Sequence, residues 1–392
     1  VTSEEGSNRL FENDGTGHFT DITTTSGLAS TGGGMCATFA DVNNDGYSDL
    51  FVSFWYPSNK LFVNETKPGR IRFRDVTNLS DLGRAVPSKS NGVVFADVNN
   101  DGFSDLFIAN RNNGNKLYLN DGKGFFADKT QDFFQSGSVM CNGAVFADFD
   151  LDGYQDLYVT NVGENVLYKN MHGSSFKDVT AIFGAELSGY CTGCVAGDID
   201  NDGDADLYVA NYINGNSSLF LNNTEKKNFV RFNLYGVRSN RDAIGAKVWL
   251  YKVIAGSSRG LLAGYREMTS GSGYASVSAK EMIFGVDGNS VYYALVKFPS
   301  SADTMRLDRI AAGNFYKIYE LKGGQAFYTE AGNAFLRFFK DREKQPEIIK
   351  FLLVGLLLVV YNLKLRKSYR NIAILRWLSS SFIFVVFVFV NQ

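Results

Sequence analysis

The sequence predicts an all-β protein: a β-propeller of repeated blades, then a smaller β domain, then a C-terminal α-helical hairpin. A nine-residue pattern, D-x-[DN]-x-D-G-x-x-D, begins at residues 41, 97, 148 and 198. The copies are separated by 56, 51 and 50 residues, a period typical of repeat architectures. Short apolar runs flank every copy, and two long apolar runs lie after residue 347.

The short runs predict four strands in each repeat. Apolar runs precede the copies at 36–40, 92–96, 143–147 and 193–197, and follow them at 50–53, 106–109, 157–160 and 207–210. A third run ends in Asn at 60–64, 116–120, 166–170 and 218–222, and a fourth begins with Phe at 73–77, 126–130 and 176–180. Short runs of β-branched and aromatic residues between turn residues indicate strands. Four strands per repeat make a propeller blade, in which each nine-residue loop joins the innermost strand to its neighbour.

The nine-residue loops carry the side chains that a hard cation requires. Asp or Asn fills positions 1, 3, 5 and 9 in every copy, and Gly at position 6 permits a sharp turn. Calcium takes about six to eight oxygen ligands, and a main-chain carbonyl at position 7 is a further ligand in such loops. The candidate ligands of about four Ca²⁺ ions are Asp41, Asn43, Asp45, Tyr47, Asp49, Asp97, Asn99, Asp101, Phe103, Asp105, Asp148, Asp150, Asp152, Tyr154, Asp156, Asp198, Asp200, Asp202, Asp204 and Asp206.

Two other interpretations of the loops fit less well. Asx-rich turns form without a metal, but four copies with every ligand position filled favour calcium. EF-hands are flanked by helices and end in Glu at position 12, whereas strand-like runs flank these loops and no Glu stands there. The last two copies have Asp rather than Asn at position 3, so we expect them to bind calcium more tightly.

Two parts of the chain resemble known families. Residues 1–225 resemble the FG-GAP/VCBS repeats of integrin α-chain propellers, and residues 226–325 resemble the ASPIC/UnbV domain of the cartilage acidic protein family. The second resemblance rests on the stretches 237–246, 270–274, 284–285 and 314–319. It implies a calcium-carrying propeller and a small β domain of no settled activity. The residues themselves predict strands at 247–253 and 292–298, and a tight turn between two strands at the Gly-rich stretch 270–274.

The N-terminus departs from a complete propeller. Residues 9–25 have the third and fourth strands of a blade but not the first two. The resemblance implies seven blades, and an open ring would leave unpaired strand edges. We therefore expect about 130–160 residues of upstream blades, at roughly fifty per blade. Truncation, processing or a separate polypeptide would account for their absence from this chain.

The C-terminus predicts a membrane anchor. A charged juxtamembrane linker at 326–347 precedes a hairpin at 348–392, whose two apolar runs are separated by a basic turn at 364–370. A helix over 348–365 would be about 27 Å long, close to the thickness of a bilayer core. A helical pair buried in a soluble core and a docking helix for a partner subunit are the alternatives. Calcium loops of modest affinity fill outside the cytosol, so we expect the propeller on the extracytoplasmic side: cell surface, periplasm or organelle lumen. Four N-x-S/T sequons agree with this side: Asn64, Asn78, Asn216 and Asn222.

The four cysteines leave alternatives open. A structural disulfide between Cys191 and Cys194 is preferred over free buried thiols, and a Cys141–Cys191 bridge is a third interpretation. Two His and a single C-x-x-C argue against zinc. We expect no enzymatic activity, because the sequence has no G-x-S-x-G, P-loop or dinucleotide fingerprint. With a net charge of −2 and no basic cluster among aromatic residues, we expect no nucleic-acid binding.

These observations predict a membrane-anchored, extracytoplasmic, calcium-binding scaffold that mediates protein or glycan interaction, including adhesion. The alternative is an accessory structural subunit of a larger membrane complex. In that case, upstream residues or another chain would complete the propeller.

Overall fold

The computed structural model describes residues 1–320 and 327–328, except for 4–5, 29–32, 57, 87, 135–139, 214, 225–227, 258 and 272. The chain forms two compact units, Val1–Ala326 and Phe327–Gln392, and β25 (Phe327–Tyr328) is the described part of the second. The hairpin expected at 348–392 lies outside the described residues, as does most of the linker before it. Within the described part of the chain, no helix combines the length and the apolar character that crossing a bilayer requires.

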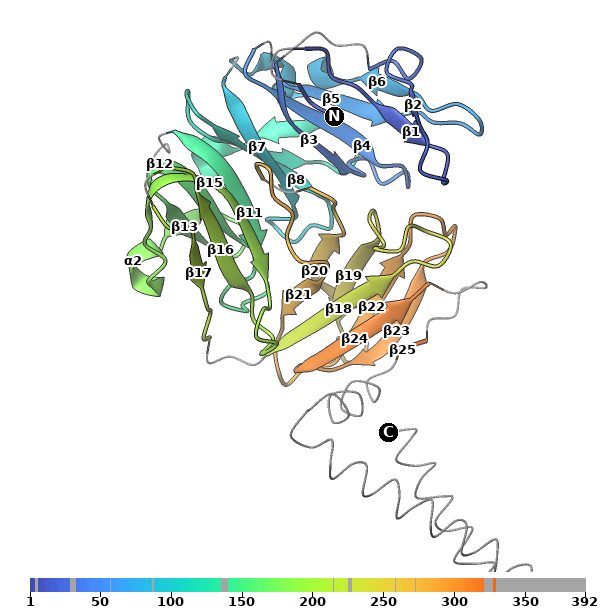
Figure 1. The fold of residues 1–392 in the computed structure, drawn as a ribbon. Coiled ribbons are helices and arrows are strands. Elements are labelled where there is room, and N and C mark those ends of the chain that lie inside the picture. The colour runs from blue at the N-terminus through green and yellow to red at the C-terminus, as the bar shows by residue number, and fades with distance from the viewer. Residues whose placement is uncertain are drawn as a thin grey trace, which may run out of the picture. The chain divides into compact units, whose positions relative to one another are not determined.

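Three blades have the predicted four antiparallel strands in chain order, with the first strand innermost (Figure 1). Blade 1 consists of β3 (Gly34–Ala40), β4 (Asp49–Phe54), β5 (Lys60–Asn64) and β6 (Phe73–Asp75). Blade 2 consists of β7 (Ser90–Ala96), β8 (Asp105–Asn110), β9 (Lys116–Asn120) and β10 (Phe126–Asp128). Blade 3 consists of β11 (Cys141–Ala147), β12 (Asp156–Glu164), β13 (Val166–Asn170) and β14 (Phe176–Asp178).

The remaining repeats are shorter. Blade 4 consists of β15 (Ser188–Gly197), β16 (Asp206–Asn211) and β17 (Ser218–Phe220), and β17 is the edge of its sheet. The N-terminal β1 (Phe11–Asn13) and β2 (Phe19–Asp21) pair with each other as the expected half blade. Short helices follow the fourth strands: η1 (Thr77–Leu79), η2 (Asp81–Arg84), α1 (Thr130–Phe133) and α2 (Thr180–Phe183).

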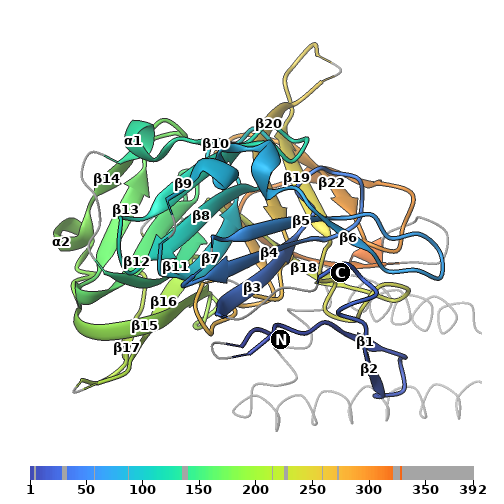
Figure 2. The same ribbon diagram turned by 90° about the horizontal axis from the view of Figure 1, so that it is seen from above.

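The innermost strands β3, β7, β11 and β15 pack side by side, so the blades follow one another around a shared axis (Figure 2). Apolar side chains of adjacent blades form separate cores between blades 1 and 2, 2 and 3, and 3 and 4. Close approach of the inner strands requires small residues. A Cβ atom at Gly143 would lie 2.6 Å from the Thr192 carbonyl oxygen, nearer than a real Cβ comes to any such atom.

The second β domain is a pair of packed sheets. Its strands are β18 (Phe229–Tyr235), β19 (Lys247–Lys252), β20 (Leu261–Glu267), β21 (Met282–Gly285), β22 (Tyr292–Lys297), β23 (Met305–Ile310) and β24 (Asn314–Tyr319). In one sheet β18 lies between antiparallel β21 and parallel β24, and the other has the order β20-β19-β22-β23. Buried side chains from both sheets, among them Phe232, Val248 and Ile318, form one core. The all-β class is thus confirmed for the described residues.

The Gly-rich stretch 270–274 differs from its prediction. Its described residues, 270, 271, 273 and 274, belong to the long connection between β20 and β21, which runs along the inner strands of the blades instead of forming a tight turn. The Gly273 N–H donates to the Val93 carbonyl at 3.0 Å, and the Thr38 hydroxyl donates to the Gly271 carbonyl at 3.1 Å. Glycine allows this contact because the backbone of one segment meets the backbone of another with no side chain between them.

The preferred disulfide is also wrong: all four cysteines are thiols. Cys191 and Cys194 lie on the same strand, β15, opposite Asn211 and Val209. The register of β15 against β16 shifts between the two cysteines, and their sulfur atoms remain unbonded. Both side chains are fully buried in the core between blades 3 and 4, as is Cys141 in the preceding core.

Candidate metal-binding loops

The four nine-residue loops lie where the sequence predicts, each between the innermost and second strand of a blade. We number them loop 1 (41–49), loop 2 (97–105), loop 3 (148–156) and loop 4 (198–206). All four have the same backbone course. Position 4 is left-handed in each, with φ of 58°, 56°, 55° and 64°, and the glycine at position 6 has φ between 93° and 104°. Loop 3 places a leucine, Leu151, in this left-handed position, which side chains rarely adopt.

Hydrogen bonds to the backbone fix the carboxylates in each loop. In loop 1, Asp41 Oδ1 accepts the Asp45 N–H at 3.1 Å and Asp41 Oδ2 accepts the Gly46 N–H at 2.8 Å. Asp45 Oδ1 accepts the N–H of Tyr47 at position 7, 2.8 Å away. Asp49 at position 9 accepts the Val42 N–H at 3.0 Å and an N–H from the third strand. The same bonds recur in the other three loops.

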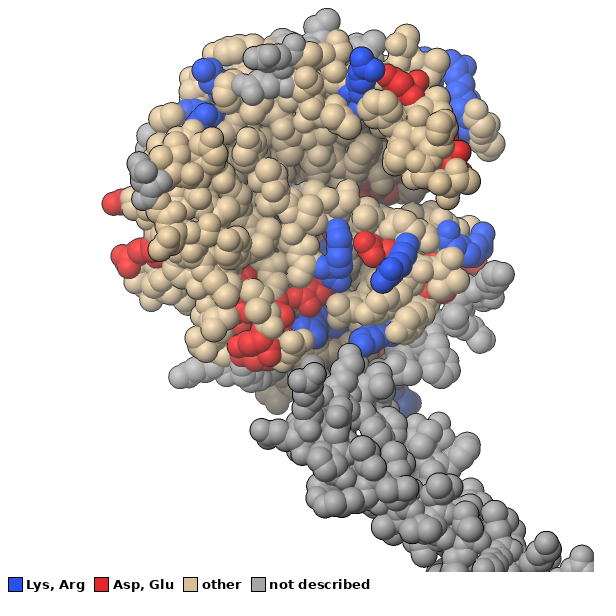
Figure 3. Space-filling view, in the orientation of Figure 1, with Lys and Arg blue, Asp and Glu red and all other residues tan. Residues whose placement is uncertain are grey.

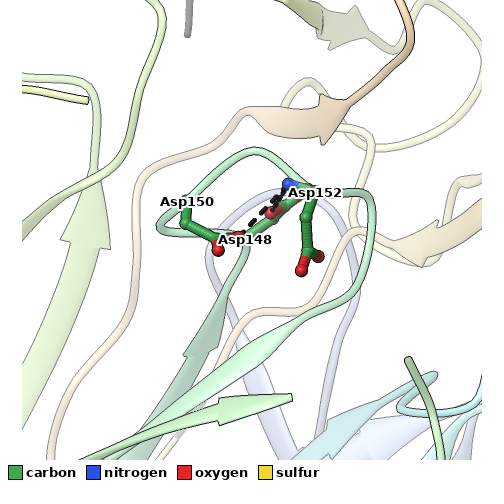
Figure 4. Close-up of side chains that lie close together, drawn as sticks. All are labelled: Asp148, Asp150 and Asp152. Carbon is green, nitrogen blue, oxygen red and sulfur yellow. Dashed lines mark hydrogen bonds between the residues drawn. The ribbon is translucent and has the colours of Figure 1, made fainter. Parts of the chain in front are cut away.

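The structure brings different ligand sets together in different loops. In loop 3, carboxylate oxygens of Asp148, Asp150 and Asp152 lie within 4.8 Å of one another (Figure 4), and in loop 4 those of Asp198, Asp200 and Asp206 do so. Loops 1 and 2 have Asn at position 3, and its amide donates to the position-5 carboxylate at 2.9 Å. Position 7, whose main-chain carbonyl is the predicted ligand, is occupied by Tyr47, Phe103, Tyr154 and Asp204.

Several of these carboxylates are buried deeply enough to disfavour a negative charge. Burial raises the pKa of Asp49, Asp97 and Asp148 to about 7, against the opposing effect of N–H donors. Burial also raises the pKa of Asp105 and Asp156 well above the usual range. An ionised carboxylate at these depths therefore needs a positive charge beside it.

Basic side chains of the second β domain reach the first residue of two loops. Lys247 on β19 donates to Asp41 Oδ2 at 2.8 Å and to Asn44 Oδ1 at 2.7 Å, and both charged groups are buried. Arg231 on β18 pairs with Asp198 Oδ2 in loop 4 and with Glu281 at 3.3 Å.

Loops 2 and 3 receive other partners. The Gly285 N–H donates to Asp148 Oδ2 at 2.7 Å. The positive charge of buried Arg266 lowers the pKa of Asp97 and Asp148, partly offsetting the effect of burial. Lys169, the fourth of the five residues of β13, donates to Asp150 and, at 2.7 Å, to Asp152, so loop 3 already holds an ammonium group.

These basic residues were missed by the sequence analysis, although a signal was present. Arg231 and Arg266 occur inside strands of the second domain, among residues that are largely buried. Basic residues are rarely buried unless they are paired with an acid. A basic residue within an apolar strand of one domain therefore indicates a carboxylate supplied by another part of the fold.

Comparison with protein families identifies both parts of the chain. The FG-GAP-like repeat matches residues 1–52, 97–159 and 148–209, and the family described as ASPIC and UnbV matches residues 236–325. The chain therefore contains FG-GAP-like repeats followed by an ASPIC and UnbV domain. This is the class of protein that the blades, the loops and the second β domain define.

Among curated proteins, the chain is similar to cartilage acidic protein 1. Identity is 30% over 173 residues for the Xenopus tropicalis protein and 28% for those of Mus musculus and Homo sapiens. The matched stretch covers 42% of this chain and 26% of each relative, so it spans about a quarter of their length.

Similarity to solved structures is weaker. A lectin of Agrocybe aegerita that recognises non-reducing terminal N-acetylglucosamine has 16% identity and a TM-score of 0.36, over 68% of this chain and 60% of that one. The Tc holotoxin pore of Photorhabdus luminescens has 18% identity and a TM-score of 0.27, over 55% of this chain and 10% of that one.

Proposed function

We propose that this chain is a calcium-stabilised, β-propeller-like scaffold that binds proteins or glycans on the extracytoplasmic side of a membrane. The observation that carries the proposal is the repetition of one loop geometry four times, with an oxygen side chain at every ligand position. Carboxylate and carbonyl oxygens arranged in a tight turn are the ligands that calcium prefers. The ion would supply the positive charge that the buried carboxylates of these loops need.

The residues of each loop fit this role to different degrees. Positions 1, 3, 5 and 9, with the main-chain carbonyl of position 7, would hold the ion. In loops 1 and 4 the second domain contacts Oδ2 of the position-1 carboxylate, and Oδ1 accepts a main-chain N–H inside the loop. In loop 3 the Lys169 ammonium competes with a cation for Asp150 and Asp152. We therefore propose calcium at all four loops, with the lysine competing for the site in loop 3.

A scaffold also requires a surface that suits a partner. The face in Figure 3 is largely uncharged, with small groups of Lys, Arg, Asp and Glu along its upper margin and over its lower half. Non-obligate protein interfaces are about as apolar as the rest of a protein surface, with few charged residues at their centre, so a mostly uncharged face is compatible with this role. Membrane anchorage would come from the apolar residues 348–392. Retention of the full chain in membranes after carbonate extraction would test this anchorage.

Thermal unfolding tests the calcium sites. We expect the melting temperature of the full chain in calcium to fall in EGTA, because unneutralised buried carboxylates destabilise the folded state. Asp101→Ala should lower the melting temperature in calcium and reduce the difference that EGTA makes. Asp303→Ala, at an exposed turn, is the control and should change neither value. An unchanged melting temperature in EGTA would contradict the proposal.

A further inference from the structure

Each blade places a pair of residues at the end of its inner strand that is remote from the nine-residue loop. One residue lies near the start of the first strand and the other near the end of the second. A main-chain hydrogen bond of 2.8–3.2 Å joins the two in every blade, with these donors and acceptors: Trp55 to Gly33, Arg111 to Lys89, Val162 to Met140, and Tyr212 to Tyr190. The four pairs are therefore equivalent positions that follow one another around the shared axis of the blades.

Three of the four blades have aromatic or basic side chains at these positions, and the side chains contact one another. Lys89 Nζ lies 5.1 Å from the centroid of the Trp55 ring, and the guanidinium carbon of Arg111 lies 5.9 Å from the same centroid. Arg111 also lies 5.4 Å from the centroid of the Tyr190 ring and donates to the Tyr190 hydroxyl. The rings of Tyr190 and Tyr212 are 5.9 Å apart. We call these five residues the rim cluster: Trp55, Lys89, Arg111, Tyr190 and Tyr212.

Buried asparagines hold the indole of the rim cluster in place. Trp55 Nε1 donates to Asn91 Oδ1 at 2.6 Å. The Asn91 amide in turn donates to Asn142 Oδ1 at 3.2 Å, and the Asn142 amide donates to the Cys191 carbonyl at 2.6 Å. Asn91 and Asn142 are 3% and 2% exposed. This chain of hydrogen bonds crosses the inner strands of blades 2, 3 and 4, so the ring is oriented before any ligand arrives, which lowers the entropic cost of binding.

The two cations of the rim cluster differ from other basic residues of the blades. Lys60, Lys116 and Arg74 pair with carboxylates at 2.5–2.8 Å. Within the described part of the chain, Lys89 and Arg111 lie over aromatic rings and form no ion pair. The guanidinium of Arg111 has five N–H donors and uses one of them there, toward Tyr190. The aromatic faces attract these cations only modestly, so the cluster retains positive charge for an anionic group.

The aromatic residues extend the rim cluster into solvent. Tyr212 is 74% exposed, and Tyr56, the neighbour of Trp55, is 58% exposed. A sugar ring packs its C–H groups on such aromatic faces, and the carboxylate or sulfate groups of acidic sugars are bound by arginine and lysine. The cluster lies at the ends of strands and not along a strand edge, so it offers a peptide main chain no strand to pair with. This combination favours a glycan over an extended peptide.

We infer that the rim cluster binds an acidic glycan, a chain of sugars that carries carboxylate or sulfate groups. Arg111 and Lys89 bind the anionic groups, and Tyr212 packs against a sugar ring. The candidate calcium ligands lie at the other end of the inner strands, so the two kinds of site are separate. This inference deepens the proposed scaffold function by naming one ligand class, and it rests on that function only in requiring that the blades bind a glycan.

The probe is a fluorescein-labelled heparin hexasaccharide, titrated with the full 392-residue chain in calcium and followed by fluorescence anisotropy. We expect saturable binding. Arg111→Gln should weaken it about tenfold or more, and Arg111→Lys should restore part of the loss, because it keeps the charge without the planar fork of donors. Tyr212→Ala should weaken binding about threefold or more, since an aromatic face is lost. Two exposed positions are the matched controls and should leave binding unchanged: Lys177→Gln on β14 and Ile182→Ala on α2.

Because Tyr212 is largely exposed, Tyr212→Ala tests the inference even if Arg111→Gln unfolds the chain. Absence of saturable binding, or equal binding by the wild-type and Tyr212→Ala chains, overturns the inference. An equal loss in Lys177→Gln and Arg111→Gln also overturns it, since binding would then be diffuse attraction between charges. Tighter binding of a fluorescein-labelled decaglutamate peptide would overturn the choice of a glycan. Saturable hexasaccharide binding by a chain whose melting temperature is the same in calcium and EGTA would support the inference and refute the calcium sites alone.

Discussion

At the first residue of a loop, one carboxylate serves two parts of the fold. Asp41 uses Oδ1 within its own loop, while Oδ2 accepts both the Gly46 N–H and the Lys247 ammonium of the second domain. In loop 3 the position-1 Oδ2 likewise accepts an N–H from the second domain, and in loop 4 it pairs with an arginine. Occupancy of a loop by a cation would therefore be linked to docking of the second β domain.

Removing Lys247 tests this contact. Lys247→Met leaves the buried Asp41 carboxylate without its partner, and breaking a buried ion pair in this way typically costs about 3–5 kcal/mol. We expect a lower melting temperature in EGTA and partial recovery in calcium. Lys252→Met, on the same strand but in an exposed pair with Asp287, is the control and should leave the melting temperature unchanged.

Lys169 makes a second prediction at the level of a single residue. Its ammonium contacts Asp150 and Asp152, so Lys169→Met should free these carboxylates for a cation and tighten calcium binding at loop 3. Calorimetric titration of the variant against the wild-type chain measures the change. Lys177→Met, an exposed lysine on β14, should have no effect. Weaker calcium binding by Lys169→Met would show that the lysine supports the site and does not compete with it.

At the scale of elements, a threonine that follows each fourth strand connects it to the third strand by a hydrogen bond. The Thr77 hydroxyl accepts the Leu61 N–H and donates to Asp75 at 2.6 Å. Thr77→Val would leave the buried Leu61 N–H without an acceptor, at a cost of about 1–3 kcal/mol. Urea unfolding should show this loss, and Thr304→Val at an exposed turn should show none. Equal midpoints for the two variants would mean that the hydroxyl contributes little to the blade.

Most blade elements could be predicted from the sequence because their signals are local. Alternating apolar residues, the Asn that ends each third strand and the Gly of each loop determine strand and turn within a few residues. Burial of Lys247, the course of the stretch 270–274 and the state of Cys191 and Cys194 could not be predicted this way. Each depends on segments that meet only after folding: a strand of another domain, the inner strands of the blades, or the pairing of β15 with β16.

For the molecule as a whole, the exposure of each sequon asparagine predicts whether it can carry a glycan. The Asn222 amide donates to two main-chain carbonyls and that of Asn64 donates to the Ser48 carbonyl, whereas Asn78 and Asn216 are exposed. We expect glycans at Asn78 and Asn216 but not at Asn64 or Asn222 when the chain passes through a eukaryotic secretory pathway. Glycopeptide mass spectrometry measures the occupancy of each site. A glycan on Asn222 would be incompatible with its contacts between blades 3 and 4.

The blades contact the second domain at the loops, so calcium bound there would stabilise both parts of the fold. Isothermal titration of calcium into the EGTA-treated, dialysed full chain tests this binding most directly. We predict saturable binding with a stoichiometry of about four ions per chain, as four loops of this type require. Heats that do not exceed those of dilution would contradict the account and leave the loops as metal-free turns held by their own hydrogen bonds.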